Sequence, residues 1–213
     1  MNLLEHSKTS NIVCTLSQTK MSENSSTEDC LICFDSFDSD DKNWRVLSCD
    51  HKVCVHCYNR INITRTTMSG IRHKSLKCPF CQITTGTIVG LCPDGNMTVR
   101  ILRSDCAGFE GVGTIQIQYY ISNSGYRLNR IAYLPNNAEG QEILELLKIA
   151  WDRRVAFTIG TSITTGVENT VVWNIHHKTN QTGGVAFFGY PDPTYFQRVK
   201  LELEANGVVL NSS

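Results

Sequence analysis

The sequence lacks an excess of charge of either sign and any long apolar run. Its 20 basic and 20 acidic residues give a formal net charge of zero, so it carries no strong electrostatic signature of nucleic-acid binding. No segment approaches the ~18 apolar residues of a membrane-spanning helix, so no membrane partner is expected. The start, MNLLEHSKTSNIVC, has no apolar run as long as that of a secretory signal peptide. These absences predict a protein of the cytoplasm or the nucleus.

Cysteine, by contrast, is abundant and clustered. Seven of the ten cysteines lie between residues 30 and 81, and one histidine completes four close pairs. In order, the eight residues are Cys30, Cys33, Cys49, His51, Cys54, Cys57, Cys78 and Cys81. Two residues between thiolates let both sulfurs reach one zinc ion at about 2.3 Å. Eight donors fill two tetrahedral sites, so the sequence predicts two zinc ions that replace the core which so small a segment lacks.

Other uses of these cysteines are less well supported. Disulfides need an oxidising compartment, whereas closely paired cysteines in a reducing compartment indicate metal ligands. A catalytic zinc ion keeps one position open for water, and here the donors fill both tetrahedra, so we expect structural zinc. Outside the pairing, we expect ordinary free cysteines and surface histidines: Cys14, Cys92, Cys106, His56 and His73. His56 is the alternative ligand if His51 is not one.

The composition divides the chain into three parts, and no internal repeat is present. Residues 1–27 are rich in Ser, Thr and Asn and predict a flexible lead. Residues 28–86 contain the paired cysteines. Residues 87–213 contain only two cysteines and have the pattern of an ordinary globular domain.

The third part mixes strands and helices. Residues 113–121 alternate, which predicts a strand whose inward side chains are Ile115, Ile117, Tyr119 and Ile121. Further strands are expected at residues 98–103, 155–159 and 170–173. Residues 139–153 predict a helix, because four apolar residues recur at helical spacing: Ile143, Leu144, Leu147 and Trp151.

A last helix is predicted from its end signals. Asp192 fits the N-cap, Pro193 the first helical position and Gly207 the residue past the end. Its inward residues are expected to be Phe196, Val199 and Leu203. Since helices and strands follow one another without regular βαβ repetition, the predicted fold class is α+β.

The ligand order resembles the RING finger of ubiquitin ligases. The single residue between Cys49 and His51 and the Cys78-Pro79-x-Cys81 pair are typical of that family, whereas a PHD-type finger has its histidine one position later. The resemblance implies a cross-brace in which the first and third pairs share one zinc ion: Cys30, Cys33, Cys54 and Cys57. The second and fourth pairs share the other: Cys49, His51, Cys78 and Cys81.

RING fingers, by this resemblance, have no catalytic nucleophile. They bind a ubiquitin-conjugating enzyme and hold its thioester-linked ubiquitin in a reactive orientation. The family's partner-binding groove corresponds to Ile32, to the segment from Val55 to Ile61 and to Pro79. Ile32 is also a candidate core residue, but its place between two ligands favours contact with a partner. Many RING fingers have an arginine after the last cysteine to contact ubiquitin; here Gln82 keeps a donor but has no charge.

The third part resembles the C-terminal domain of the Deltex family. The strings GTIQIQYY, RIAYLPNNAEG, FTIGTS, TVVWN, IHHKT, GG and GYPDP follow in the family's order over about residues 87–210. Deltex proteins join a RING finger to this domain by a short link. The N-terminal protein-binding domains of longer members are absent here, so the resemblance implies a short member.

From the residues alone, the segment 160–202 offers modest chemistry. His176 and His177 can titrate near neutrality, and glycines such as those after residue 182 let a backbone approach a ligand closely. Three aromatic rings could stack on a base: Phe187, Phe188 and Tyr190. A His–Glu pair with Glu202 would suit general acid–base chemistry. The alternative is a structural histidine pair and a solvated glutamate.

The Deltex resemblance implies more. In that family the domain binds NAD+ and ADP-ribose and, with the RING finger, supports ADP-ribosylation of the ubiquitin C-terminus and attachment of ubiquitin to ADP-ribosylated targets. His176 matches the first histidine of the family's Ile-His-His-Lys-Thr motif, as ligand contact and acid–base group. Glu202 matches its functional glutamate, as a base on a ribose hydroxyl. The other expected dinucleotide contacts are Thr161, Ser162, Phe188 and Tyr190.

Two departures from the family pattern affect this site. Phe188 replaces a tyrosine or histidine, so it keeps stacking but loses a polar edge. The family has an acidic residue between Trp-Asn and Ile-His-His, whereas Trp173-Asn174 here runs directly into Ile175. A deletion at a strand end can turn the following side chains to the other face, which bears on whether His176 meets Glu202.

Three functions compete at this point. The first is a Deltex-type ubiquitin ligase, with a ubiquitin-conjugating enzyme, ubiquitin, a substrate protein and ADP-ribosylated proteins as partners. The second is a zinc-stabilised adaptor that binds partners without stimulating transfer or regulates a longer relative, and Gln82 favours it. The third is a nucleic-acid-binding zinc protein, against which the neutral charge counts.

Overall fold

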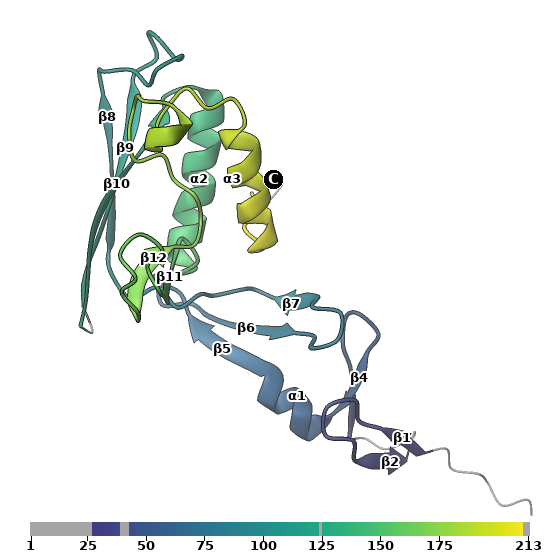
Figure 1. The fold of residues 1–213 in the computed structure, drawn as a ribbon. Coiled ribbons are helices and arrows are strands. Elements are labelled where there is room, and N and C mark those ends of the chain that lie inside the picture. The colour runs from purple at the N-terminus through teal and green to yellow at the C-terminus, as the bar shows by residue number, and fades with distance from the viewer. Residues whose placement is uncertain (1–26, 39–42, 124, 211–213) are drawn as a thin grey trace, which may run out of the picture.

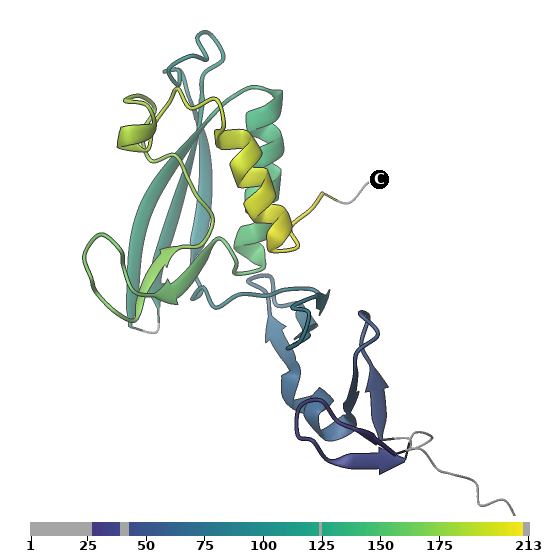
Figure 2. The ribbon, with the colours of Figure 1, turned by 45° about the vertical axis from the view of Figure 1, so that its right-hand side comes forward.

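The computed structural model describes residues 27–38, 43–123 and 125–210 (Figure 1). The predicted flexible lead, except for Thr27, lies outside these residues, as does Cys14. The described residues form an elongated molecule in which an N-terminal part (residues 27–86) is followed by a C-terminal part (residues 87–210), as Figures 1 and 2 show.

The N-terminal part consists of short antiparallel strands around one short helix. Its elements are β1 (Thr27–Asp29), β2 (Ser36–Asp38), β3 (Trp44–Val46), β4 (Lys52–Cys54), α1 (Val55–Ile61), β5 (Asn62–Thr66), β6 (Arg72–Lys77) and β7 (Thr84–Gly86). β1 pairs with β2, β3 with β4, and β6 lies between β5 and β7. Four of the seven residues in its buried core are cysteines, so apolar packing alone gives this part little to hold it together.

The C-terminal part packs two helices on one face of an antiparallel sheet (Figures 1 and 2). Its elements are β8 (Asn96–Leu102), β9 (Thr114–Asn123), β10 (Tyr126–Pro135), α2 (Ala138–Asp152), β11 (Phe157–Gly160), β12 (Thr170–Trp173), η1 (Val185–Phe187) and α3 (Tyr195–Ala205). The sheet order is β10-β9-β8, and β11 and β12 form a separate hairpin. The mixed fold confirms the predicted α+β class.

The periodic segments form the elements that their patterns predicted. On β9 every second residue from Ile115 to Ile121 is fully buried, and α2 buries Ile143, Leu147 and its other inward residues. α2 begins after Asn137, whose side chain accepts a hydrogen bond from the N–H of Gly140. A Cβ at this glycine would lie 1.9 Å from the carbonyl oxygen of Pro135, so only glycine fits the close approach of strand and helix.

The last helix begins later than its sequence signals predicted. α3 starts at Tyr195 with Thr194 as N-cap, so the assignment of Asp192 as N-cap and Pro193 as first helical residue is wrong. The buried Asp192 carboxylate pairs with Lys178 and Arg198, and the backbone amide that it accepts is that of Thr194, which precedes the helix. The predicted end is confirmed: Gly207 follows the helix with a φ of +68°.

Among the described residues, no helix has both the length and the apolar character needed to cross a membrane. The longest helix, α2, has 15 residues and carries charged side chains on its exposed face. It therefore serves as the support on which the sheet and α3 pack.

The central packing of α2 gives the first testable prediction. Leu147→Ala removes a fully buried side chain, so we expect it to lower the free energy of unfolding of the C-terminal part by about 2–5 kcal/mol. The matched control is Leu201→Ala on α3, whose side chain is 59% exposed and whose loss should cost less than about 0.5 kcal/mol. Denaturant unfolding of both variants measures the difference, and equal losses would contradict this account of the core.

Candidate zinc clusters and a histidine–glutamate site

The structure gathers the eight paired residues into two groups of four. The ligand atoms of Cys30, Cys33, Cys54 and Cys57 lie within 4.8 Å of one another, and so do those of Cys49, His51, Cys78 and Cys81. These are the groups that the cross-brace implies. β4 and α1 position the third pair, and the turns before β2 and β7 position the first and the last.

The spacing of the donors fits zinc. Four sulfurs bound to one zinc ion at the corners of a tetrahedron stand about 3.8 Å apart, because each lies about 2.3 Å from the ion. The sulfurs of Cys33 and Cys54 are 3.8 Å apart. In the second group, Nδ1 of His51 lies 3.4 Å from Sγ of Cys49, so Nδ1 is the ring nitrogen that would bind a zinc ion held by this group. His56 is exposed and outside both groups.

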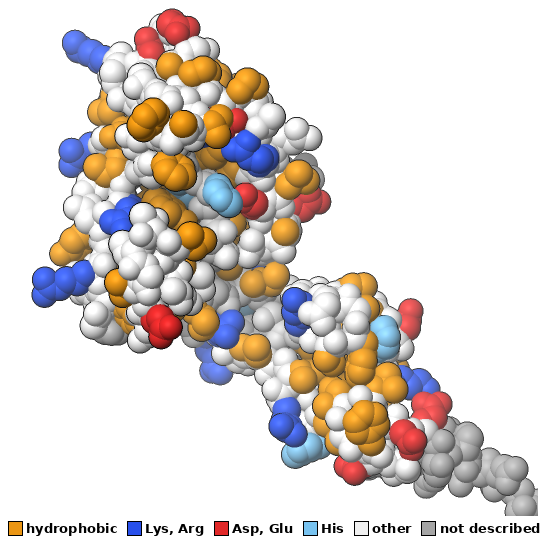
Figure 3. Space-filling model, in the orientation of Figure 1, with side chains coloured by type: hydrophobic (Ala, Val, Ile, Leu, Met, Phe, Trp, Pro, Cys, Tyr) orange, Lys and Arg blue, Asp and Glu red, His pale blue; other side chains and the backbone are white. Residues whose placement is uncertain are grey.

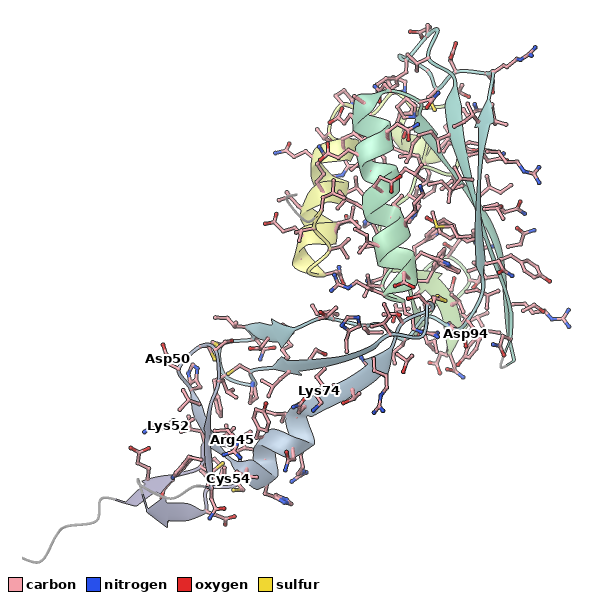
Figure 4. The ribbon with its side chains drawn as sticks, turned by 180° about the vertical axis from the view of Figure 1, so that it is seen from behind. Arg45, Asp50, Lys52, Cys54, Lys74 and Asp94 are labelled. Atoms are coloured by element: carbon pink, nitrogen blue, oxygen red, sulfur yellow. The ribbon has the colours of Figure 1, made fainter. Side chains whose placement is uncertain are left out.

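Backbone donors favour the thiolate form of Cys30, which is the form that binds zinc. The N–H of Cys54 points at Sγ of Cys30 over 3.4 Å, and the N–H of Cys57 points at Sγ of Cys54 over the same distance. Burial raises the pKa of the Cys30 thiol, but the N–H groups of Cys54, Cys33 and Ile32 outweigh it and lower the pKa to about 6. Cys54 stands at the start of α1 as its N-cap (Figure 4).

The predicted partner-binding residues lie on or near the surface of the N-terminal part. Ile32, Val55 and Ile61 are half-buried, while Pro79 and Gln82 are exposed. Ile32 also packs against the small core, so it both supports the fold and presents a face.

Two apolar neighbours of these residues are also exposed. Leu31 and Phe80 are 45% and 41% exposed, and the sequence analysis did not single them out. Their position in a tight turn between two ligands is a signal that could have identified them. Gln82 folds back, and its Nε2 donates to the carbonyl oxygen of Pro79 over 2.9 Å.

A histidine and a glutamate meet on the C-terminal part. Nδ1 of His176 lies 2.6 Å from Oε1 of Glu202 on α3, and the backbone N–H of His176 donates to Oε2 over 2.8 Å. Because a carboxylate oxygen only accepts, Nδ1 carries a proton, and in the neutral imidazole Nε2 then has the free lone pair. The missing residue before Ile175 therefore does not separate His176 from Glu202.

This pair is accessible from solvent. The His176 side chain is 80% exposed and the Glu202 side chain 29%. Figure 3 shows a histidine and an acidic side chain next to each other on the C-terminal part, with hydrophobic side chains around them. The arrangement leaves Nε2 of His176 open to a ligand.

The adjacent histidine has a structural environment. His177 is buried, stacks on Trp173 and accepts a hydrogen bond from the hydroxyl of Tyr119 at 2.9 Å. Its Nδ1 donates to the carbonyl oxygen of Ile175. Burial lowers the pKa of His177 to about 4, so this ring stays neutral near pH 7.

A buried ion pair holds the histidine segment against α3. Nζ of Lys178 lies 2.6 Å from Oδ2 of Asp192, and the two side chains are 5% and 1% exposed. Arg198 on α3 completes the network, and its hydrogen bonds, together with those of Lys178, hold the pKa of Asp192 well below its usual range. Since Arg198 and Glu202 share one helix, this network sets where Glu202 meets His176. Sequence analysis missed it, although Lys178 and Asp192 fall inside two of the quoted family strings.

The other predicted dinucleotide contacts differ in how exposed they are. Thr161 is exposed and Ser162 half-buried in the β11–β12 loop, where the Ser162 hydroxyl accepts the N–H of Thr165. Phe188 is 66% exposed in a left-handed conformation, and its carbonyl oxygen accepts the N–H of Thr179, three residues after His176. Its ring is available for stacking.

Tyr190 is not available to a ligand. Its ring is fully buried and packs edge-on against Phe109 and Tyr195. Its hydroxyl donates to the carbonyl oxygen of Tyr133. The expectation that Tyr190 contacts a dinucleotide is therefore corrected: it belongs to the core beneath the site.

Two clefts on the described surface lie away from His176 and Glu202. One, of about 470 Å³, lies between the two parts, beside Thr66, Cys92, Asp94 and Arg154. The other, of about 270 Å³, lies against β9 and β10 from Tyr120 to Arg130. The histidine–glutamate pair is thus a surface site and not part of either cleft.

Two four-donor Cys/His clusters in a RING-like grouping, compatible with zinc binding, are followed by an α+β domain with a histidine–glutamate pair; together they define a RING-like protein with a second domain. The family model of the Deltex C-terminal domain matches residues 89–208. The chain belongs to the Deltex family, as its sequence strings indicated.

The names of the curated relatives state an activity. The human E3 ubiquitin-protein ligase DTX1 is 39% identical over 170 residues, which cover 73% of this chain and 27% of that protein. The human probable E3 ubiquitin-protein ligase DTX3 is 40% identical over 178 residues, covering 75% of this chain and 48% of that protein. The mouse E3 ubiquitin-protein ligase DTX4 is 35% identical over 175 residues, covering 75% and 28%. The matched region thus spans between about a quarter and a half of these relatives.

Zinc content tests the two clusters. The chain should bind two zinc ions, and Cys78→Ala should lower this to about one per chain because three donors hold the ion far less tightly. Cys106→Ala is the matched control, since this buried cysteine lies outside both clusters and its loss should leave two ions. Elemental analysis of the purified proteins gives the ratio. Two ions retained in the Cys78 variant would contradict the assigned ligand set.

Proposed function

We propose that this chain is a RING-type E3 ubiquitin ligase whose C-terminal part binds ADP-ribose or NAD+. The N-terminal part would bind a ubiquitin-conjugating enzyme through the surface around Ile32 and Pro79. The C-terminal part would hold the dinucleotide at His176. The observation that carries the proposal is the contact of His176 with Glu202, which gives a Deltex-family chain an exposed, oriented imidazole.

The zinc ions, when bound, act as structural supports. The two clusters hold the turns that carry Ile32 and Pro79, since each of these residues lies between two ligands. The residues themselves supply the contact surface: half-buried and exposed apolar side chains next to the exposed Leu31 and Phe80. Binding a conjugating enzyme there would orient its thioester-linked ubiquitin without any nucleophile from this chain.

The proposed reaction joins ubiquitin to a ribose hydroxyl of ADP-ribose. The hydroxyl oxygen attacks the thioester carbonyl carbon at the ubiquitin C-terminus, an ester C–O bond forms, and the C–S bond breaks. The cysteine of the conjugating enzyme leaves as a thiolate, and the hydroxyl proton passes to Nε2 of His176. The same ribose hydroxyls are present in free ADP-ribose, in ADP-ribosylated proteins and in NAD+, so all three are candidate acceptors.

Glu202 has a different role from the one that the resemblance implied. Both of its carboxylate oxygens accept hydrogen bonds from His176, so we assign it to orienting the imidazole and stabilising its protonated form. His176 is then the general base. Phe188 offers an exposed ring for stacking on a base, and Thr161 and Ser162 remain proposed ligand contacts.

A non-catalytic adaptor is the second candidate function. One observation favours it: the Gln82 amide, which stands where many RING fingers have an arginine, is engaged by Pro79. An adaptor would bind a conjugating enzyme without accelerating discharge of its ubiquitin.

Single-turnover discharge of thioester-linked ubiquitin from a conjugating enzyme separates the two functions. We expect the chain to accelerate discharge, and Ile32→Ala to reduce the rate about tenfold, because it removes a contact of hot-spot size. Val46→Ala is the control, since Val46 is 61% exposed on β3 and outside the proposed surface. Binding of the conjugating enzyme without faster discharge would support the adaptor instead.

Labelled NAD+, supplied with ubiquitin-activating enzyme, conjugating enzyme, ubiquitin and ATP, tests the dinucleotide site. Labelled ubiquitin should form, and His176→Ala should reduce it by about 10²-fold or more, because the general base is lost. Glu202→Ala should also reduce it strongly. The control is Glu204→Ala, an exposed acidic residue two positions along the same helix. Labelling that survives both site changes would place the chemistry elsewhere.

A further inference from the structure

The two parts of the chain are attached to each other at more than the segment that links them. The turn between β5 and β6 reaches the C-terminal end of α2 (Figure 1). Within this turn Thr67 is 2% exposed, and Met68 packs against the core of the C-terminal part. The N-terminal part is therefore held by a docked hairpin as well as by the linking residues 87–95.

Asp152, the last residue of α2, holds the tip of this hairpin. Its carbonyl oxygen accepts the N–H of Met68 over 2.8 Å, and its Oδ1 accepts the N–H of Ser69 over the same distance. A single residue thus satisfies two successive backbone donors of the turn. A hydrogen bond to an ionised carboxylate is stronger than one between neutral groups, so this contact favours a fixed turn.

Arg154 connects the C-terminal part to the β5–β6 hairpin and to the linking segment. We call these contacts, together with those of Asp152, the joint. Its Nε donates to the carbonyl oxygen of Thr66 on β5, and its Nη1 donates to that of Cys92 in the linking segment, each over 2.8 Å. Its Nη2 pairs with Asp94, which Figure 4 shows at the junction of the two parts. Arg154 adopts a left-handed backbone conformation with a φ of +59°, which non-glycine residues seldom keep without such constraints.

Arg153 adds contacts from the same turn. Its Nε donates to the carbonyl oxygen of Ile88, and its Nη1 donates to that of Gly207 just past α3. Its own carbonyl oxygen accepts the N–H of Gly90. Three consecutive residues therefore bind the hairpin, the linking segment and the end of α3. A part held by one linker can swivel, whereas one held at separate points of its chain cannot.

We propose that Asp152 and Arg154 are positioning residues that lock the two parts in one relative orientation. This inference rests on the proposed function. The lock would keep a fixed path between the thioester presented by the N-terminal part and a ribose hydroxyl held at His176. Reaction between groups held in one orientation is faster than reaction between groups that sample many, so the lock acts on the coupled transfer alone.

Residual dipolar couplings of the zinc-loaded full chain test the lock directly. The wild-type chain should show one alignment tensor for both parts. Arg154→Ala and Asp152→Ala should each give two different tensors, because side-chain contacts to the hairpin or the linking segment are lost. Lys148→Ala is the control: it removes an exposed cation of α2 that pairs only along its own helix with Glu145.

Two activities measured on the same proteins give the functional half of the test. In Arg154→Ala and Asp152→Ala, transfer of ubiquitin to labelled NAD+ should fall at least tenfold. Discharge of thioester-linked ubiquitin to free lysine and the affinity for ADP-ribose should stay within twofold of the wild type, since neither needs the two parts in a fixed relative orientation. If Arg154→Ala does not fold, Asp152→Ala carries the same test, because it removes one side-chain contact where Arg154→Ala removes three.

The outcomes separate cleanly. One shared tensor in both variants would show that these residues do not hold the joint. Unchanged coupled transfer despite two tensors, or an equal fall in all three activities, would show that the lock does not serve the transfer. Absence of coupled transfer in the wild type would defeat the proposed function and this inference together. If the wild type nevertheless shows one tensor, the joint is rigid but serves no transfer.

Discussion

The constraint on which the N-terminal part depends is the closure of two four-donor clusters. Its buried core holds four cysteines and only three aliphatic residues, so apolar packing cannot fix the strands by itself. The clusters draw together segments from Cys30 to Cys81. The surface around Ile32 and Pro79 and the root of the β5–β6 hairpin both follow from that closure. Loss of one cluster would therefore affect the contacts between the two parts as well as the proposed partner-binding surface.

The C-terminal part is held together mainly by buried apolar side chains, and a buried ion pair lies among them. Its sheet and α2 form a continuous apolar core, within which Lys178 and Asp192 form a nearly inaccessible pair. Breaking such a pair is costly, because the remaining charge stays buried without a partner. The pair fixes the segment of His176 against α3, and Glu202 then makes two contacts to that residue. An exposed imidazole is thus oriented by groups that lie mostly inside the protein.

Sequence patterns predicted what depends on neighbours along the chain. The alternation on β9, the helical spacing on α2 and the Cys-x2-Cys pairs each express a local geometry, and the structure has these elements where they were expected. The grouping of the ligands came from family resemblance and not from spacing. The start of α3 and the role of Tyr190 were wrong, because Asp192 and Tyr190 are committed to partners distant in sequence, such as Lys178 and Tyr133. The contacts of the joint could not be predicted from the sequence for the same reason, because residues such as Asp152 and Ser69 are 83 positions apart.

The hydrogen bonds of that joint use backbone acceptors on one side and side-chain donors on the other. The atoms that Arg153 and Arg154 reach on the other segments are mostly backbone carbonyl oxygens, at Thr66, Ile88, Cys92 and Gly207. Every residue type offers such an oxygen, so substitutions there leave the acceptors in place. The donors are two particular guanidinium groups that no other side chain reproduces. Substitutions at these four acceptor positions therefore keep the hydrogen bonds in place, whereas replacing either arginine removes them.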